Sequence, residues 1–341
     1  MQACALLMPA AAVLTSLSVL LSAADSMGVL SGPDWAAGAF QRFRHEFNRS
    51  YRPGSDDFRR SLHNFRDSLR RHSFLNLHDS GNGSARYALN QFSDLSPREF
   101  RERYLRATAE KTPKYTTPSR EEAVTGPPPL RFDWREKNIV TPVQSQQSCG
   151  GCWAFSVVGG IESVSAMGGR GLQQLSVQQV LDCSSKNHGC QGGSTTGALR
   201  WLNQTKVKLV RQSDYPFKAE TGICHYFAPS LSGVSIRDFV AYDFSGLEGE
   251  MMARLLQWGP LAVTVDAVSW QDYLGGIIQH HCSSGEANHA VLVTGYDRTG
   301  DVPYWIVRNS WGPSWGNEGY VYIKMGGNVC GIADMVTAAF L

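Results

Sequence analysis

The residues best suited to chemistry lie in one short stretch, from Gln146 to Ser156. It contains two cysteines in the spacing Cys149-Gly-Gly-Cys152, followed directly by Trp153. A thiol with a pKa of about 8.5 is mostly protonated at neutral pH, so its reactivity depends on how readily it forms a thiolate. The stretch could therefore contain a redox-active dithiol or a single cysteine nucleophile.

The residues after Cys152 predict an element that would activate its thiol. Val157, Ile161 and Val164 recur at spacings of three and four, which indicates a helix that begins near Cys152 and ends at Gly168-Gly169. The N-terminus of a helix carries roughly half a positive charge. We therefore expect the thiol pKa of Cys152 to be lowered, and lowered by several units if an imidazolium lies nearby.

The cysteine count depends on the first 24 residues. Residues 1–24 carry no charged side chain, and the small residues Ser22-Ala23-Ala24 precede Asp25. This pattern predicts a cleaved signal peptide, with an uncleaved anchor as the alternative. Cys4 would leave with it, and seven of the eight cysteines would remain in an oxidising compartment. Six can then pair, and one is left as a reactive or intermolecular thiol.

Composition divides the rest of the chain in two. Residues 25–127 contain 17 Lys+Arg against 13 Asp+Glu and no cysteine, whereas residues 128–341 contain 15 against 17. Thr112 to Pro129 is rich in proline and predicts an exposed linker. The formal net charge of +2 gives no indication of nucleic-acid binding. No later stretch approaches the roughly 20 apolar residues of a membrane span.

Hydrophobic periodicity places helices before strands in the second part. An apolar stripe over residues 35–78 predicts helices in the first part. In the second part we expect further helices at 177–181 and 195–202, and strands at 261–265, 290–294, 304–307 and 320–324. A helical half followed by a β half predicts an α+β fold with two lobes.

The stretch around Cys152 resembles the papain/cathepsin family of cysteine proteases, whose signature is a Cys-Gly-Ser/Ala-Cys-Trp/Tyr run with a downstream His and Asn. The resemblance extends from Leu130 to Ala333 and supplies the two downstream residues. These are His289 in Ala287-Asn-His-Ala-Val291 and Asn309 in Arg308-Asn-Ser-Trp-Gly312. Gly151 replaces the usual Ser or Ala, and Gln147 replaces a usual Gly and is expected to alter the local turn.

The resemblance implies a domain organisation. It implies a signal peptide at 1–24, an inhibitory propeptide at 25–127 and a mature papain-like peptidase domain at 128–341. The mature domain would have a helical lobe at about 140–235 and a β-barrel-like lobe at about 236–341, with the active-site cleft between them. Within the first part, Ala88-x-Asn90-x-Phe92-x-Asp94 resembles the family's propeptide motif, with Ala for Gly.

The same resemblance implies a role for each catalytic residue. Cys152 would be the nucleophile, and His289 would protonate the leaving amine. Asn309 would orient the imidazole, and Trp311 would shield that hydrogen bond from water. The oxyanion hole would consist of the Gln146 side-chain amide and the Cys152 backbone N–H.

Disulfides, subsites and glycan acceptors follow from the resemblance and from short motifs. The resemblance selects the disulfides Cys149–Cys190, Cys183–Cys224 and Cys282–Cys330. It also implies a substrate-binding set of Gly192, Gly193, Ser194, Thr195, Thr264, Ala287, Ala290, Trp311 and Met335. This mostly uncharged set predicts an uncharged residue at P2, two positions before the cleaved bond, or a basic one if Asp334 turned inward. Asn-x-Ser/Thr sequons mark Asn48, Asn82 and Asn203 as glycan candidates.

The predicted function is that of a lysosomal cysteine endopeptidase made as a secretory zymogen, with partial secretion as a further expectation. It would act without a cofactor or metal as a monomer. Its partners would be protein and peptide substrates, its own propeptide as inhibitor and, by resemblance, cystatin-type inhibitors. Two alternatives stay open, a Cys-x-x-Cys thiol–disulfide oxidoreductase and a catalytically silent binding module. The first requires both Cys149 and Cys152 to be free.

Overall fold

The structure is a computed structural model that describes residues 33–78, 81, 83–116, 126–226, 232–282 and 286–341. The predicted signal peptide, the glycan candidate Asn82 and Cys4 lie outside these residues. The described chain divides into two compact units, residues up to 66 and residues 67–341. No helix among the described residues is long and apolar enough to cross a membrane.

The first unit contains two helices, as the apolar stripe predicts. They are α2 (Pro33–Glu46) and α3 (Asp56–His78), whose second half belongs to the second unit. The ring of Phe40 lies 6.1 Å from that of Phe43, 5.5 Å from Phe58 and 5.3 Å from Phe65. Phe40 and Phe65 are fully buried, so aromatic side chains form the core of this small unit.

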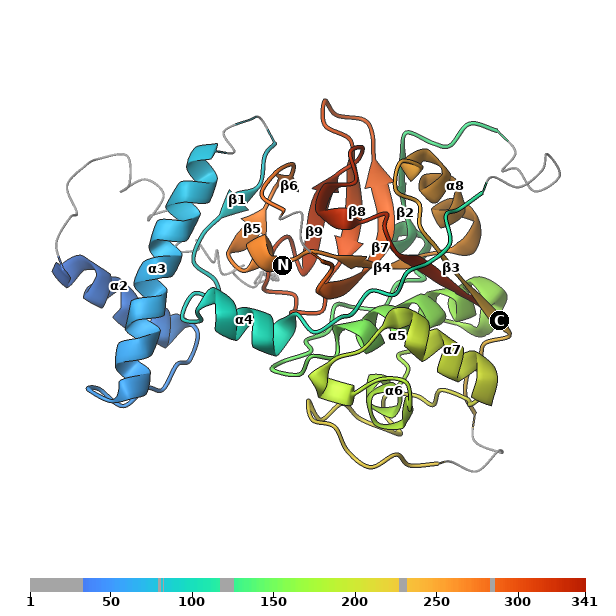
Figure 1. Cartoon of the computed structure of the whole chain (residues 1–341), viewed down its shortest axis with the longest axis horizontal. Helices are drawn as coiled ribbons and strands as arrows, with labels where there is room; N and C mark the ends of the chain where they lie inside the picture. The colour runs from blue at the N-terminus through green and yellow to red at the C-terminus, as the bar shows by residue number, and fades with distance from the viewer. Residues whose placement is uncertain (1–32, 79–80, 82, 117–125, 227–231, 283–285) are drawn as a thin grey trace, which may run out of the picture. The chain divides into compact units, whose positions relative to one another are not determined.

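The second unit contains the remaining elements, which Figure 1 labels. After α3 come β1 (Arg86–Tyr87), α4 (Pro97–Tyr104), β2 (Arg131–Asp133), α5 (Cys152–Ser165), α6 (Val177–Cys183), α7 (Thr195–Thr205), β3 (Asp238–Tyr242), α8 (Glu248–Trp258), β4 (Leu261–Val265), β5 (Tyr273–Gly275), β6 (Ile277–Ile278), β7 (His289–Asp297), β8 (Tyr304–Arg308), β9 (Tyr320–Lys324) and β10 (Val336–Phe340). This content confirms the predicted α+β class.

Two buried clusters correspond to the two predicted lobes. One gathers the apolar faces of α5, α6 and α7, with Trp153 and Ile161 fully buried. The other gathers the strands, with Val263, Val293 and Trp305 fully buried. In Figure 1 the green and yellow helices of the first cluster lie together beside the orange and red strands of the second.

The strands form an open sheet with the order β3-β10-β4-β7-β8-β9-β6, and β2 pairs with β7 outside that path. All pairs in it are antiparallel except β6 with β9. Within the described residues the edge strands β3 and β6 do not pair with each other, so the barrel-like closure that the resemblance implies is absent there. The sheet also contains β3 and β10, which the periodicity analysis did not predict, and α8 lies within the half expected to be β.

We use the term leader segment for the described residues 33–116. Part of it packs into the strand cluster, because Tyr87, Phe92, Phe100 and Tyr115 are buried in the same core as the strands. Strand β1 pairs antiparallel with β5, with Tyr87 opposite Tyr273. The part of the leader segment after residue 66 is therefore integrated into the folded second unit.

Candidate active site

Cys152 is the first residue of α5 and is fully buried. Its position at the helix start is the one the sequence predicts, and a helix start leaves backbone N–H groups without intrahelical partners. Among the described cysteines Cys152 is the free one. Cys149 is bonded to Cys190, and the pairs Cys183–Cys224 and Cys282–Cys330 are bonded as well.

His289 begins strand β7 and is also fully buried. Its Nε2 lies 2.7 Å from Asn309 Oδ1, and its ring stacks on Trp311 at 4.7 Å between centroids. Because an amide oxygen can only accept, Nε2 carries the proton in the neutral imidazole, and Nδ1 is left as the base. Within the described part of the chain, Nδ1 has no hydrogen-bond partner.

The turn before His289 is held firmly. Asn288 Nδ2 donates to Asp266 Oδ1 at 2.7 Å, and Asn288 Oδ1 accepts from the backbone N–H of Ala267 at 3.0 Å. Backbone N–H groups of Ala290 and Trp153 act on the Cys152 thiol and oppose a rise in its pKa. These contacts bring the start of β7 to the start of α5, so the structure brings Cys152, His289 and Asn309 to one site.

The expected oxyanion donor Gln146 is buried beside the same site. Its Nε2 donates to the backbone carbonyl of Tyr104 at 3.1 Å and to that of Cys149 at 3.0 Å. Its Oε1 accepts from Ser310 Oγ at 2.6 Å, which fixes which way the amide faces. Sequence reasoning missed Ser310; the available indication was its position next to Asn309.

Gln147 adopts a φ of +51°, the left-handed conformation that a glycine takes most readily. A residue with left-handed backbone therefore occupies this position of the turn. Ser145 Oγ accepts from the Gln147 N–H at 3.2 Å and supports it. Gly151 packs closely, because a Cβ there would lie 3.0 Å from Leu181 Cδ2.

After α4 ends at Tyr104, the leader segment crosses this site without helical structure as far as Glu110, and we call residues 104–110 the cleft segment. The Ala107 N–H donates to the Asn288 carbonyl at 3.0 Å. Gly193 N–H donates to the Arg106 carbonyl at 3.2 Å, and its carbonyl accepts from Thr108 N–H at 2.9 Å. The cleft segment thus pairs its main chain with Gly193, the residue expected to pair with substrate backbone.

Gly192 is required for this approach. A Cβ on Gly192 would lie 2.4 Å from the Arg106 carbonyl oxygen, and its φ of +121° is unfavourable for other residues. Of the other expected subsite residues, Thr195, Thr264, Ala290, Met335 and Trp311 are all buried, and Ala287 is half-buried. Asp334 is exposed and accepts from Asn328 Nδ2 at 2.6 Å, so it does not turn inward.

Burial shifts the pKa values of Cys152 and His289 away from those expected from sequence. Burial raises the pKa of the Cys152 thiol, although backbone groups of Ala290, Arg106, Trp153 and Ala107 act to lower it. Burial likewise lowers the pKa of His289 to about 4, against the opposing effects of Asn309 and the Tyr104 backbone. Burial therefore favours the neutral forms of both groups in this structure, whereas the sequence predicts a lowered thiol pKa.

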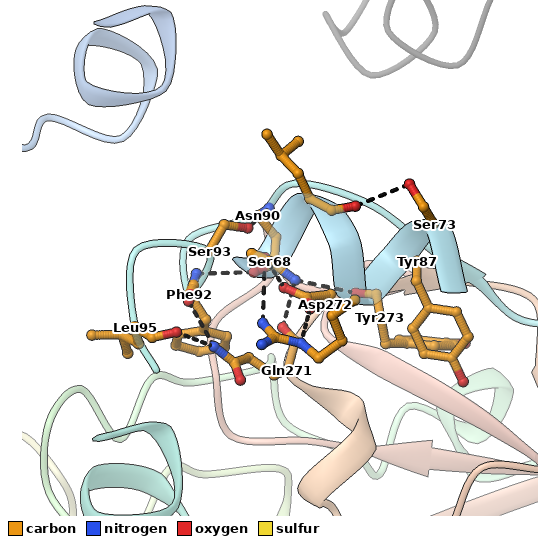
Figure 2. A network of polar contacts seen from close by, with 12 residues as sticks. Ser68, Ser73, Tyr87, Asn90, Phe92, Ser93, Leu95, Gln271, Asp272 and Tyr273 are labelled. Atoms are coloured by element: carbon orange, nitrogen blue, oxygen red, sulfur yellow. Dashed lines mark hydrogen bonds and ion pairs between the residues drawn. The ribbon is translucent and has the colours of Figure 1, made fainter. Parts of the chain in front are cut away.

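A second set of contacts binds the leader segment at a place apart from Cys152, and Figure 2 shows these contacts. We call it the anchor: Ser68, Arg71 and Asn90 of the leader segment with Gln271 and Asp272. Asp272 is fully buried and accepts from Ser68 Oγ at 2.7 Å and from Arg71 Nε at 2.5 Å. Asn90 Nδ2 donates to the Gln271 carbonyl at 2.8 Å. Removal of one partner of such a pair would leave a buried charge uncompensated, which is strongly destabilising.

Comparisons with known proteins agree with this geometry. Residues 128–340 match the family described as papain family cysteine protease, and residues 40–100 match the cathepsin propeptide inhibitor domain. The chain belongs to the papain family of cysteine proteases, and it carries that family's inhibitory propeptide domain.

Individual relatives are similar over most of their length. The chain is 62% identical to cathepsin O of Homo sapiens over 278 residues, which are 81% of this chain and 87% of that protein. It is 60% identical to cathepsin O of Mus musculus, over 81% of this chain and 88% of that protein. Among solved structures, procathepsin L2 from Tenebrio molitor larval midgut has a TM-score of 0.80 and 30% identity, covering 90% of this chain and all (100%) of that one.

Proposed function

We propose that this papain-family zymogen becomes a lysosomal endopeptidase that hydrolyses peptide bonds of proteins through Cys152, His289 and Asn309. The observation that carries the proposal is the site itself. A free thiol at the start of α5 lies beside the start of β7, where His289 is hydrogen-bonded to Asn309 at 2.7 Å. The same thiol is covered by the cleft segment, as an inhibited precursor requires.

Removal of the cleft segment would allow the thiolate–imidazolium pair to form. Water would then reach the site, and the burial that raises the Cys152 pKa and lowers the His289 pKa would be relieved. The thiol proton would pass to His289 Nδ1, while Nε2 stays bonded to Asn309. The dipole of α5 would favour the thiolate at its N-terminus.

The chemistry then has two halves. The Cys152 thiolate attacks the scissile carbonyl carbon, and the oxyanion is stabilised by Gln146 Nε2 and the Cys152 N–H. The carbon–nitrogen bond breaks, the amine takes the proton from His289, and a thioester to Cys152 remains. Water, deprotonated by His289, attacks the thioester, and the thiolate leaves as the carboxylic acid product departs.

The domain boundaries belong to the same proposal. We assign 1–24 to a signal peptide, 25–127 to the propeptide and 128–341 to the mature enzyme. Three disulfides among the described cysteines suit an oxidising secretory route to the lysosome or to the exterior. Asn48 is exposed and Asn203 is half-buried, so both remain glycan candidates.

Partners follow from the assignment. Protein and peptide substrates would bind along Gly192 and Gly193 in place of the cleft segment. Cystatin-type inhibitors would occupy the same cleft, and the mature enzyme would act as a monomer. A dithiol oxidoreductase is not favoured, because Cys149 is bonded to Cys190 rather than free beside Cys152.

The test is N-terminal sequencing of the active species combined with active-site titration. The purified full chain is acidified, and turnover of a fluorogenic peptide is followed. We expect activity to appear as the leader is lost, with a new N-terminus near Pro128 and one titratable thiol per chain. Turnover by the Cys152→Ser variant equal to that of wild type would refute the mechanism.

A further inference from the structure

Glu110, at the end of the cleft segment, places a carboxylate on the surface of the helical lobe. Its Oε1 accepts from Ser194 Oγ at 2.8 Å, and its Oε2 lies 3.2 Å from Arg200 Nη2. Its backbone N–H points to Met335 Sδ at 3.2 Å. Glu110 therefore reaches residues implicated in substrate binding, Ser194 and Met335, together with an arginine that sequence reasoning did not single out.

Ser194 is placed and oriented so that its hydroxyl can donate to a negatively charged group. It is the N-cap of the 11-residue helix α7, and its side chain accepts from the Gly197 N–H. Its Oγ also lies 3.1 Å from Thr196 Oγ1, which in turn donates to Met335 Sδ at 3.7 Å. With Thr196 donating to sulfur, the Ser194 hydroxyl proton is directed to Glu110. The dipole of α7 adds to this attraction at its N-terminus.

Arg200 supplies the charge of opposite sign. It lies on the same helix as Ser194 and is about half exposed, with 46% of its side chain accessible against 36% for Glu110. In the described part of the chain, Glu110 is the carboxylate paired with it. An arginine and a hydroxyl aimed at one carboxylate are groups by which proteins bind acidic side chains.

The neighbouring pocket residues are polar as well. Thr195 and Thr264 are fully buried, and among the described residues neither hydroxyl has a hydrogen-bond partner. Asp334, which would repel an acidic ligand, is exposed and bonded to Asn328 instead. The surroundings of the Ser194–Arg200 pair are therefore compatible with a negatively charged occupant.

We propose that Ser194 and Arg200 form a carboxylate-binding subsite that Glu110 fills in the zymogen and that an acidic substrate side chain fills in the mature enzyme. This inference rests on the proposed protease function and replaces the uncharged P2 preference expected from sequence. The cleft segment pairs with Gly193 in parallel. Ser194 and Arg200 contact Glu110 through its carboxylate oxygens, so a substrate side chain at P2 or P3 can present its carboxylate to the same groups.

The experiment uses mature enzyme obtained by processing the full chain, at pH 6, where a Glu side chain with a pKa of about 4.3 is ionised. Four blocked fluorogenic peptides carry Glu or Gln at P2 or at P3 and are otherwise identical. At one of the two positions we expect kcat/KM for Glu to exceed that for Gln by about three- to fivefold, a modest factor because the pair is partly exposed. The difference should lie in KM and should shrink at high salt.

Arg200→Gln should bring the Glu/Gln ratio to about one, and Arg170→Gln is the matched control. Arg170 is an exposed arginine of the same lobe just beyond the far end of α5 from Cys152, so its loss should leave the ratio unchanged. In the zymogen, Glu110→Gln and Arg200→Gln should speed activation by similar factors that do not multiply in the double variant.

A ratio of one or below at both positions in wild type would overturn the proposal, as would a ratio that Arg200→Gln leaves intact. In either case the pair would be only a latch of the leader segment. Hydrolysis of the Gln peptides by wild type and not by Cys152→Ser separates such a failure from a failure of the proposed protease function.

Discussion

The anchor and the cleft segment hold the same leader to the enzyme by different means. At the anchor, specific side chains meet a fully buried carboxylate, Asp272, through Ser68 and Arg71. In the cleft, most contacts near Cys152 are made by main-chain groups, as in the pairing of Arg106 and Thr108 with Gly193. Main-chain contacts are available to any peptide, so the cleft can exchange its leader for substrate. The side-chain contacts of the anchor therefore make the binding specific for the leader segment.

The largest expected effect is at the cleft. Cys152→Ser should lower kcat by at least about 10⁴-fold, because the activated nucleophile is lost while binding groups remain. KM should change little, since Gly193 and the cleft walls are intact. Turnover measured on mature enzyme gives the result. A kcat within tenfold of wild type would show that Cys152 is not the nucleophile.

Opening of the zymogen compares the two regions directly. Asp272→Asn removes the charge that Arg71 and Ser68 contact, and a hydrogen bond to a charged group contributes about 1.5–3 kcal/mol. The rate at which a thiol-specific epoxide labels Cys152 in the intact chain at pH 7 should rise by roughly 10- to 100-fold. Mature Asp272→Asn enzyme should turn over peptide normally.

Thr108→Ala is the matched change in the cleft segment. Thr108 is exposed and contributes its backbone N–H to the pairing with Gly193. The rate at which the epoxide labels Cys152 in the Thr108→Ala chain should stay within about threefold of wild type. Surface substitutions typically change stability by less than ~0.5 kcal/mol. An equal or larger effect of Thr108→Ala than of Asp272→Asn would reverse the roles assigned to the two regions.

Acid should loosen the cleft side through His289. Its pKa is lowered to about 4 in the folded zymogen, whereas the unfolded chain binds the proton near pH 6.5. The stability from the neutral imidazole is thus fully present above about pH 6.5 and is lost as the pH falls towards 4, by up to roughly 3 kcal/mol.

Urea unfolding of the Cys152→Ala zymogen at pH 7 and pH 4.5 measures this loss. The loss should be smaller in the Cys152→Ala/His289→Gln chain, which lacks the titrating imidazole. The same pH dependence in both chains would assign the acid sensitivity to groups other than His289.

Ser310→Ala tests positioning within the cleft. Ser310 Oγ bonds Gln146 Oε1 at 2.6 Å, so its loss leaves the oxyanion donor less well oriented. We expect kcat of the mature enzyme to fall about tenfold, less than the ~10²–10³ typical of deleting an oxyanion donor, with KM nearly unchanged. Ser314→Ala, at an exposed serine, should have no such effect. An unchanged kcat for Ser310→Ala would show that Gln146 needs no such support.

Local patterns predicted much of the fold, and the resemblance predicted the site. The strands at 261–265 and 320–324 are β4 and β9 themselves, because alternating or continuous β-branched runs are local features. Helix α8 was missed although Met251, Met252 and Leu255 have helical spacing and are buried on one face. The helix was missed because it lies in the half of the chain that was expected to consist of strands.

Long-range contacts explain what sequence could not supply. Asp272 meets Ser68 and Arg71 across about 200 residues of chain, so no local pattern marks it. The same holds for Glu110 and Arg200, which lie 90 residues apart. The direction of the Cys152 pKa shift also escaped prediction, because it depends on burial, which only the fold determines.

We propose that Cys152 is the nucleophile and that the cleft segment covers it in the zymogen. The direct test is labelling with a peptidyl epoxide before and after processing of the full chain, with the modified residue located by mass spectrometry. We expect negligible labelling of the intact chain at neutral pH, and one label per chain, on Cys152, once the leader is removed. Equal labelling of Cys152 before and after processing, or a label on another cysteine, would contradict it.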